Sequence, residues 1–234
     1  LVIIIFETIL GNLQPLICLP LAIIGFYDDL KGAPKFLRYL IQFFTVLFLI
    51  INSNVLSLLP ENFPSFIVVI FILFLIFSGT AIINFTNFMD GIDGLVCGSM
   101  IIIFFALNSE VHYLLPMIGT LCGFLYFNWY PSKIFMGDIG SLFLGTFLVS
   151  LIYSSSSGSE GILKILLLCS PLLLDALACI FRRLINKKNI FNSHKSHLYQ
   201  RLVSNGMKHS TVSIIYILSI ALLAIFYTYS SLMN

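Results

Sequence analysis

Charged residues are scarce in this 234-residue chain, making up 9% of it, while hydrophobic residues make up 59% and the mean hydropathy is +1.04. An ordinary soluble domain is about a quarter charged. So few charges cannot cover the surface of a water-soluble globule. The sequence therefore predicts an integral membrane protein with the lipid bilayer as its main solvent, and no nucleic-acid partner is expected.

Grouped thiols and a signal peptide are also lacking. The five cysteines have no paired spacing, so a disulfide framework or zinc site is not expected. A signal peptide has a basic region before its apolar run and a small-residue cleavage site after it. The first apolar run, Leu1–Phe6, has neither. Because the chain begins inside an apolar run, we expect residues 1–234 to be a single membrane domain that lacks its N-terminal helices.

Long apolar runs are what the chain has instead. A spanning helix needs about 20 mostly apolar residues, and the runs lack the two-residue alternation of a barrel strand. The expected fold class is all-α, a polytopic transmembrane helical bundle of about eight spans plus an N-terminal remnant at Leu1–Leu10. The expected spans are Leu13–Tyr27, Leu37–Ile51, Phe66–Ile83, Leu95–Leu107, Tyr113–Phe127, Ser141–Tyr153, Ile162–Phe181 and Val212–Tyr229.

The basic residues predict the orientation of these spans. Eleven of the twelve Lys and Arg residues lie in or beside alternate loops, and Lys164 is the exception. Because cytoplasmic loops carry the Lys and Arg excess, these loops are expected to face the cytoplasm. They are Asp28–Phe36, Asn84–Gly94, Trp129–Gly140 and Arg182–Thr211.

The most specific motif is Asn84–Leu95, which places Asn84, Asn87, Asp90 and Asp93 between long apolar runs. A glycine follows each aspartate, so the backbone can turn tightly and approach a ligand. Asp93 or the next glycine could simply cap the helix that follows. That reading explains one aspartate but neither the second nor the two amides, so a functional site is favoured.

Two further acidic motifs lie in the same set of loops. Asp28 and Asp29 end a predicted helix, where negative charge opposes the helix dipole unless a cation is bound. A solvated helix end is the equal alternative. Asp138 lies between glycines before the helix predicted from Ser141, where it could cap that helix or bind a metal.

The loop Arg182–Thr211 adds His194, Lys195, His197 and Arg201. Contact with anionic lipid would explain its first basic residues. Two histidines three apart among basic residues indicate phosphate contacts or acid–base chemistry. Asp175, in the preceding apolar run, is expected to face the bundle interior and has no assigned role.

Oxygen ligands beside phosphate-binding cations predict Mg²⁺ or Mn²⁺ and a diphosphate substrate. The reaction class that follows is phosphoryl transfer at the cytoplasmic membrane surface.

In these motifs the chain resembles the polyprenyl-phosphate N-acetylhexosamine-1-phosphate transferases, which are bacterial inner-membrane enzymes. The resemblance rests on the paired Asp28-Asp29, the block Asn-x-x-Asn-x-x-Asp-Gly-x-Asp-Gly-Leu at 84–95, the Gly-Asp-x-Gly-Ser block at 137–141 and the histidine loop. It covers residues 25–201. It implies transfer of a sugar 1-phosphate from a UDP-N-acetylhexosamine to a polyprenyl phosphate, with release of UMP.

By matched position the resemblance implies that Asp138 is the Mg²⁺ ligand, with Asp90 and Asp93 near the metal and nucleotide. Asp28 or Asp29 would be the base or would organise the lipid phosphate, and the two histidines would contact the diphosphate. Asn84, Asn87, Lys195 and Arg201 complete the expected substrate contacts. Direct transfer, an aspartyl intermediate and a homodimer all stay open. The histidine loop looks most like the branch that initiates O-antigen, with UDP-N-acetylglucosamine or a 6-deoxy-N-acetylhexosamine donor.

Two other functions fit the sequence less well. A CDP-alcohol phosphotransferase would need the pattern Asp-Gly-x-x-Ala-Arg, but Asp90-Gly91 is followed by Ile-Asp-Gly-Leu, with no Ala-Arg. A transporter or channel would favour carboxylates near the membrane midplane and an internal repeat. Here the aspartates gather on one predicted face and no repeat is visible.

Overall fold

The computed structural model describes residues 14–60, 62–108, 114–187 and 196–232, and the regular elements in these ranges are all helices. The all-α prediction is therefore confirmed. The expected remnant Leu1–Leu10 lies outside the described residues. Backbone contacts divide the chain into two compact units, Leu1–Asn87 with Met136–Leu166 and Phe88–Phe135 with Leu167–Asn234, and each is described by itself. The expectation of a single domain stays a prediction.

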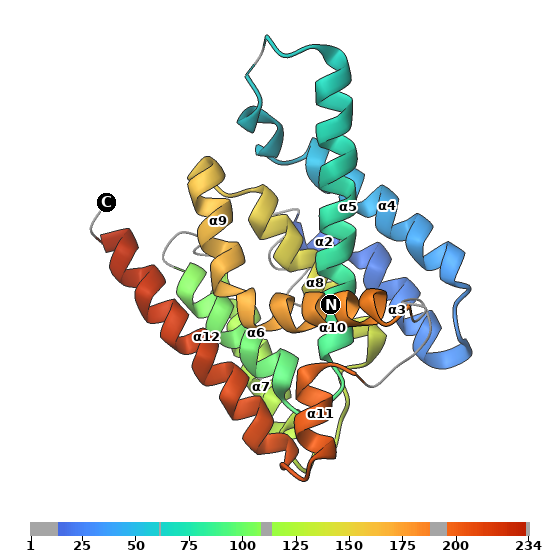
Figure 1. The fold of residues 1–234 in the computed structure, drawn as a ribbon, viewed down its shortest axis with the longest axis vertical. Coiled ribbons are helices and arrows are strands. Elements are labelled where there is room, and N and C mark those ends of the chain that lie inside the picture. Colours follow the sequence, from blue (N-terminus) through green and yellow to red (C-terminus); the bar gives the residue numbers. More distant parts are fainter. Residues whose placement is uncertain (1–13, 61, 109–113, 188–195, 233–234) are drawn as a thin grey trace. The chain divides into compact units, whose positions relative to one another are not determined.

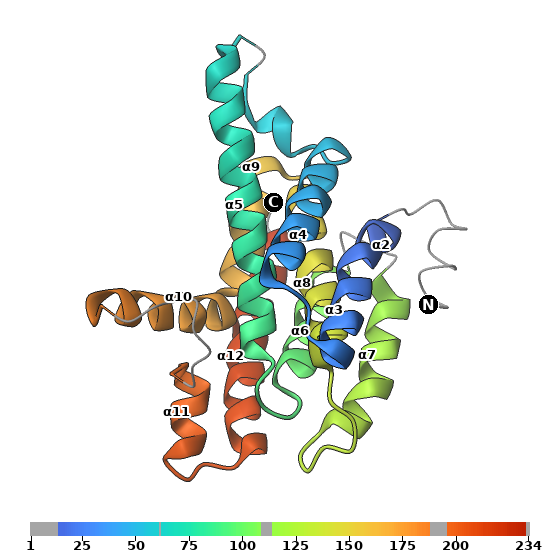
Figure 2. The ribbon, with the colours of Figure 1, turned by 90° about the vertical axis from the view of Figure 1, so that its right-hand side faces the viewer.

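The first unit is built around α8. Its elements are α2 (Gln14–Ile17), α3 (Leu19–Lys31), α4 (Lys35–Ile51), the short 3₁₀ helix η1 (Val55–Leu58), α5 (Ser65–Met89), α8 (Gly137–Tyr153) and α9 (Gly158–Leu168), the last residues of α5 and α9 belonging to the second unit. Figure 2 shows α2, α3 and α4 beside α8, and α8 is buried along nearly its whole length. A helix that is apolar all round belongs in a core.

Close packing of α3 on α8 positions the acidic motifs. A Cβ atom at Gly25 of α3 would lie 2.5 Å from the carbonyl oxygen of Asp138 at the start of α8. Only glycine permits this approach. The C-terminal turn of α3, with Asp28 and Asp29, therefore meets the N-terminal turn of α8.

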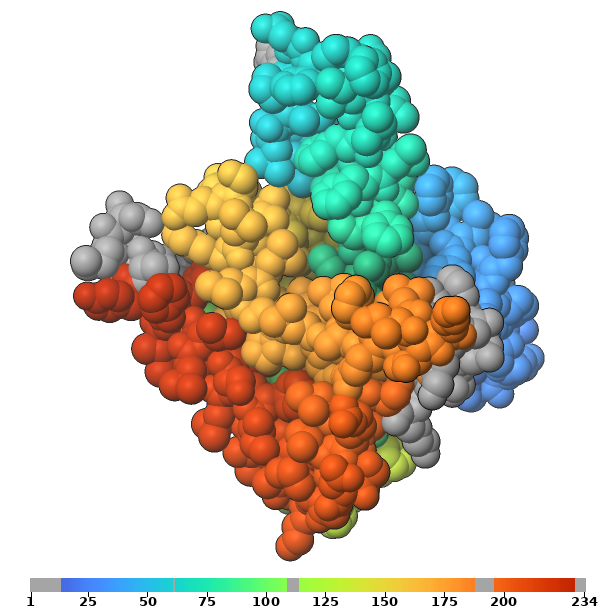
Figure 3. Space-filling view, in the orientation of Figure 1, coloured from blue at the N-terminus to red at the C-terminus, as the bar shows by residue number. Residues whose placement is uncertain are grey.

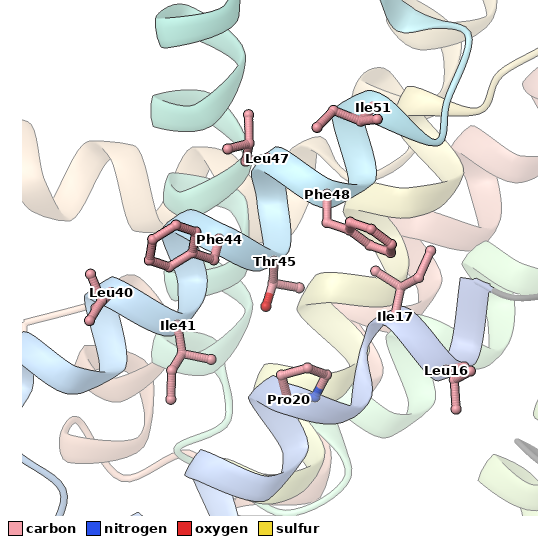
Figure 4. A pocket seen from close by; sticks show the side chains of 10 residues that line it. All are labelled: Leu16, Ile17, Pro20, Leu40, Ile41, Phe44, Thr45, Leu47, Phe48 and Ile51. Atoms are coloured by element: carbon pink, nitrogen blue, oxygen red, sulfur yellow. The ribbon is translucent and has the colours of Figure 1, made fainter.

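An apolar groove of about 590 Å³ runs along α4 in the same unit (Figure 4). Leu16, Ile17 and Pro20 form one side of it and side chains of α4 form the other, with Thr45 as the polar exception in the lining. Exposed aromatic side chains such as Phe44 suit a lipid environment.

The second unit contains α6 (Leu95–Leu107), α7 (Leu114–Asn128), α10 (Ser170–Ile185), α11 (Leu198–Ser204) and α12 (His209–Leu232). Figure 1 shows α6 and α7 alongside α12, and α6 packs on both. A Cβ atom at Gly98 would collide with the side chain of Ile217, so α6 and α12 approach closely. The short α11 lies against α10 and α12, as the space-filling view also shows (Figure 3).

Two helices in the described ranges are long and apolar enough to cross a membrane, the whole of α5 and the His209–Tyr229 part of α12. The pair α9 and α10, bent by 74°, would make a third if it forms one broken span. The helices α6, α7 and α8 are apolar but shorter. Transmembrane helices are therefore present as candidates, and the count of eight spans stays a prediction.

Several predicted bounds were wrong. The span predicted at Leu13–Tyr27 is two helices, α2 and α3, and α3 continues to Lys31, so Asp28 and Asp29 lie in its last turn and not in the loop. The α5 helix continues past Ile83 to Met89, so Asn84 and Asn87 are helical rather than part of a loop. The α8 helix begins at Gly137 rather than Ser141, which places Asp138 inside its first turn and not at its N-cap. The single span expected at Ile162–Phe181 is two helices, because the chain bends at Cys169, directly before the Ser-Pro start of α10.

Candidate active site

Arg38 of α4 is the centre of a polar cluster in the first unit. Its Nη1 donates to Asp28 Oδ2 at 3.0 Å and to Asp138 Oδ2 at 2.8 Å. Its Nη2 donates to Asn87 Oδ1 at 3.2 Å. Two of the predicted catalytic or metal-binding aspartates and one predicted amide are therefore brought together by one cation.

The amide of Asn87 completes the cluster. Its Nδ2 donates to Asp138 Oδ1 and to Ser141 Oγ, both at 2.8 Å, and the Ser141 hydroxyl donates to the carbonyl of Gly137. Because Asn87 lies in the last turns of α5, this bonding explains why α5 continues beyond its apolar part. Each polar group that the helix carries there finds a partner.

The two carboxylates of the cluster differ in acidity. Burial raises the pKa of Asp138 above its ordinary value, although Asn87 and Arg38 act against the rise. Burial acts on Asp28 in the same direction, but the hydrogen bond from the Ala33 amide at 2.5 Å and the contact with Arg38 hold its pKa below the ordinary value. Neighbouring carboxylates pushed apart in pKa are typical of functional sites.

Asp29 has a different position from its neighbour. Its Oδ1 accepts the backbone N–H of Asp138 at 2.9 Å, and its Oδ2 accepts that of Ile139 at 3.1 Å. These are free amides at the positive end of α8, which a carboxylate satisfies well. Gly137, with φ of 66°, leaves room, since a Cβ there would lie 2.6 Å from Asp29 Oδ2. Asp29 therefore holds α8 in place.

Asn84 is buried one turn before Asn87 and does not join the cluster. Its Nδ2 donates to Gln42 Oε1 at 3.0 Å and to the carbonyl of Thr80, and Gln42 Nε2 donates back to Asn84 Oδ1 at 3.3 Å. Gln42 and Arg38 are four residues apart on α4, so the Gln42–Asn84 and Arg38–Asn87 pairs lie about one helical turn apart between α4 and α5. Asn84 is placed to support Asn87.

The cluster fits a divalent cation that brings its own phosphate ligands. Among the described residues no group of three or more His, Cys, Asp or Glu side chains is arranged to hold a metal ion. However, Asp28 and Asp138 converge with more negative charge than Arg38 neutralises. Mg²⁺ is commonly held by one or two carboxylates together with substrate phosphates and water.

In the second unit, Asp93 and Gly94 shape the turn before α6. Asp93 Oδ2 accepts the backbone N–H of Ser132 at 3.2 Å and lies 3.5 Å from Nδ1 of His209. Gly94 is the N-cap of α6, one of the two predicted candidates, and its φ of 73° requires glycine. A Cβ at Gly94 would lie 2.7 Å from the ring of Trp129, the single tryptophan of the chain.

Tyr199 of α11 reaches the segment that contains Asp90. Its hydroxyl donates to the carbonyl of Phe88 at 2.8 Å and occupies the space that a Cβ at Gly91 would need. Burial raises the pKa of Tyr199, and the charges of Asp175 and Asp90 add to the rise, so the hydroxyl stays a donor. The glycine after Asp90 is therefore explained by the close approach of a tyrosine.

His197 is the N-cap of α11 and is buried. Its backbone N–H donates to Gln200 Oε1 at 3.2 Å, and its ring lies 5.7 Å from the ring of Tyr199. His194 and Lys195 lie outside the described residues. Arg201 lines a small basic pocket of about 240 Å³ whose walls are Cys179, Arg182, Arg183, Asn186, Ser196 and Arg201.

Three groups in these clusters were missed as site residues by reasoning from the sequence. Arg38 and Gln42 lie four apart on the otherwise apolar α4, and this spacing of polar groups on one helix face was the available signal. Ser141 was placed only as the start of a helix. Asp175 was correctly expected to be buried, but nothing in the sequence identified its partners.

Comparison with known proteins shows which family this chain matches. The model of glycosyl transferase family 4 matches residues 15–156, more than half of the chain. A probable undecaprenyl-phosphate N-acetylglucosaminyl 1-phosphate transferase of Bacillus subtilis is 36% identical over 151 residues, which are 58% of this chain and 42% of that protein. A decaprenyl-phosphate N-acetylglucosaminephosphotransferase of Mycobacterium tuberculosis is 31% identical over 175 residues, 62% of this chain and 43% of the relative.

A phospho-N-acetylmuramoyl-pentapeptide-transferase of Clostridioides difficile is 35% identical over 156 residues, 56% of this chain and 48% of the relative. The chain thus spans less than half the length of each of these three relatives. The family match covers all of the Arg38 cluster and the Asp90–Asp93 segment. On this match, the chain belongs to glycosyl transferase family 4.

Proposed function

We propose that this protein transfers an N-acetylhexosamine 1-phosphate from a UDP-sugar to a polyprenyl phosphate and releases UMP. The observation that carries the proposal is that Asp28 and Asp138 both bond to Arg38, with Asn87 also on Asp138, in a chain with so few charges. Relatives whose names state transfer of an amino-sugar phosphate, two of them to a polyprenyl phosphate, support the substrate class. The reaction would take place at the cytoplasmic face of a bacterial inner membrane, at the start of O-antigen or another envelope polysaccharide.

In this reaction an oxygen of the lipid phosphate attacks the phosphorus that carries the sugar. A new phosphorus–oxygen bond forms, and the bond from that phosphorus to the bridging oxygen of the diphosphate breaks, so that UMP leaves with the bridging oxygen. Because a phosphate monoester is largely a dianion at neutral pH, its oxygen needs no general base. The chain's main task is to position the phosphates and neutralise their charge.

The first unit supplies the acidic part of this machinery. Asp138 and Asp28 would hold a Mg²⁺ or Mn²⁺ ion, which when bound supplies positive charge to the diphosphate. Arg38 keeps the two carboxylates together. The lowered pKa of Asp28 makes it a weak base, which suits a ligand better than a proton acceptor. Asp29 keeps the first turn of α8, and with it Asp138, in position.

Direct transfer is the form of the reaction that these contacts support. Both oxygens of Asp28 and both of Asp138 accept hydrogen bonds, and those of Asp29 accept two helix amides. A carboxylate nucleophile would weaken these bonds, because the attacking oxygen gives up its negative charge when it bonds to phosphorus. In the second unit, Asp90, Asp93, His197 and Arg201, with His194 and Lys195, are the proposed contacts to the nucleotide and diphosphate.

The experiment compares the wild type with Asp138→Asn in membranes given radiolabelled UDP-N-acetylglucosamine and undecaprenyl phosphate. The wild type should form labelled lipid only with Mg²⁺ or Mn²⁺ present. Asp138→Asn should lose about 100-fold or more of this activity while inserting normally. The matched control is Glu160→Gln, at an exposed acid that pairs with Lys164, and it should keep wild-type activity. Near-normal turnover by Asp138→Asn would refute the metal role, and substrate flux without lipid product would refute the transferase.

A further inference from the structure

Asp175 is a buried carboxylate in α10 that the proposed chemistry does not use. It is 6% exposed and lies in the apolar part of the helix, between Leu174 and Ala176. An ionisable group in such a position is expensive unless its partners satisfy it. Both of its oxygens accept hydrogen bonds from groups of the second unit.

Two of its donors are the first amides of α11. The backbone N–H of Leu198 donates to Asp175 Oδ1 at 2.6 Å, and that of Tyr199 donates to Asp175 Oδ2 at 3.2 Å. These amides have no partner within their own helix, and they form its positive end. A third donor, the hydroxyl of Tyr216 on α12, lies 2.7 Å from Oδ2. One carboxylate on α10 therefore joins three helices of the second unit.

The helix held in this way carries two groups that matter for the site. His197, its N-cap, directly precedes the two amides that Asp175 accepts. Tyr199 extends its side chain to the carbonyl of Phe88 and against Gly91, next to Asp90. Gln200 adds to this connection, since its Nε2 donates to the Tyr199 hydroxyl at 3.0 Å. The end of the histidine loop and the start of the Asp90–Asp93 segment are thus connected to one carboxylate.

We propose that Asp175 is a positioning residue for the transfer reaction, which sets the place of His197 directly and that of the Asp90–Asp93 segment through Tyr199. This inference rests on the proposed function, because it takes those two groups to be donor contacts. Displacement of such contacts by about 1 Å is enough to lower the rate by about 100-fold.

The first test needs no activity. Amide hydrogen exchange of the purified protein in nanodiscs is measured for the wild type and for Asp175→Asn, which keeps the size of the side chain but removes its charge and one acceptor. Exchange at Leu198 and Tyr199 should become roughly 10- to 100-fold faster, because hydrogen bonds to a charged acceptor are lost. Exchange in α6 should not change. Unchanged exchange in α11, or an equal increase in α6, would overturn the proposal.

Two tyrosine variants on α12 provide a graded comparison. Tyr216→Phe removes one of the three donors to Asp175 and leaves the α11 amides bonded, so it should accelerate their exchange less than Asp175→Asn does. Tyr227→Phe is the matched control, because it removes a hydroxyl from another buried tyrosine of the same helix. It should leave α11 exchange at the wild-type rate. Equal effects of the two variants on α11 would contradict the proposal.

Kinetics separate positioning from simple loss of folded protein. In Asp175→Asn, KM for the UDP-sugar should rise, and kcat/KM for it should fall about 10- to 100-fold, while KM for polyprenyl phosphate is unchanged. A purely structural role would lower the amount of active enzyme and leave both KM values unchanged, and that result would overturn the proposal. If the wild type makes no lipid product, the proposed function fails, and the exchange measurement still decides what Asp175 does to α11.

Discussion

Replacing Arg38 by methionine removes a cation that pairs with both Asp28 and Asp138. Two hydrogen bonds between charged groups and one to Asn87 are lost. Such bonds contribute about 1.5–3 kcal/mol each when well shielded. The side chains of Arg38, Asp28 and Asp138 are 19%, 20% and 30% exposed, so solvent screening reduces these values. We expect Arg38→Met to lower the free energy of unfolding by about 2–4 kcal/mol in total at neutral pH in EDTA.

The size of this loss should depend on pH and on Mg²⁺. Without Arg38 the pKa of Asp28 loses one of the causes that lower it, so both carboxylates should become less acidic. The two negative charges repel each other at neutral pH, and the repulsion disappears as the pH falls and they are protonated. The deficit relative to the wild type should therefore shrink in acid. Mg²⁺ should replace the missing charge and restore part of the stability at neutral pH.

Thermal unfolding in nanodiscs, followed with and without Mg²⁺, measures these effects. The expected loss corresponds to a midpoint lowered by roughly 5 to 15 °C in EDTA. Lys164→Met is the matched control, because Lys164 pairs with an exposed glutamate one turn away, and its midpoint should equal that of the wild type. If Arg38→Met unfolds at the wild-type temperature in EDTA, or is not stabilised by Mg²⁺, the view of Arg38 as the counter-charge of a cation site is wrong.

Three further changes test other contacts. Gln42→Leu and Asn84→Leu should each cost about 1–3 kcal/mol in urea unfolding, because each leaves a buried amide without its partner, and the double variant should cost less than the sum. Gly91→Ala should displace the hydroxyl of Tyr199 and shift the fluorescence of Trp129, because the ring of Trp129 lies against Gly94 in the same segment. Adding Tyr199→Phe to this variant should partly restore the wild-type spectrum, and a spectrum that is not restored would contradict the close approach. Burial raises the pKa of Asp28, but the Ala33 amide and Arg38 outweigh it and hold that pKa below its ordinary value. The contribution of Asp28 to stability is therefore present at neutral pH and is lost as the pH falls through the lowered pKa. Asp28→Asn should flatten this acid dependence, and an unchanged midpoint-against-pH curve would refute it.

The sequence predicted which segments carry the clustered polar side chains, because its signals there are local. Aspartates followed by glycine between long apolar runs can be recognised without knowing what they contact. The positive φ of Gly94 and the N-cap there follow from the same local rule. The helical class and most of the helices follow from apolar runs that are too long for strands.

Long-range partners decided the features that the sequence did not reveal. Asn84 and Asn87 were predicted in a loop because they are polar, yet α5 continues through them because Gln42 and Arg38 satisfy their amides. Asp28 and Asp29 are adjacent and chemically identical, but one faces Arg38 and the other caps α8. No pattern along the chain distinguishes the two, since the difference comes from the packing of α3 on α8.

The same limit applies in the second unit. The short helix α11 has only seven residues, and nothing in its composition separates it from the basic loop around it. It is stabilised by Asp175 of α10, which lies 23 residues before Leu198 in the chain. The break between α9 and α10 was missed because the apolar run passes through it without interruption.

The position of the phosphate after reaction tests the central claim most directly. Membranes that contain the protein are given undecaprenyl phosphate and UDP-N-acetylglucosamine labelled with ³²P at the phosphorus next to the sugar. Transfer of the sugar 1-phosphate predicts that the label appears in the lipid diphosphate and that unlabelled UMP is released in equal amount, dependent on Mg²⁺. Label released as UDP, with sugar alone on the lipid, would contradict the account.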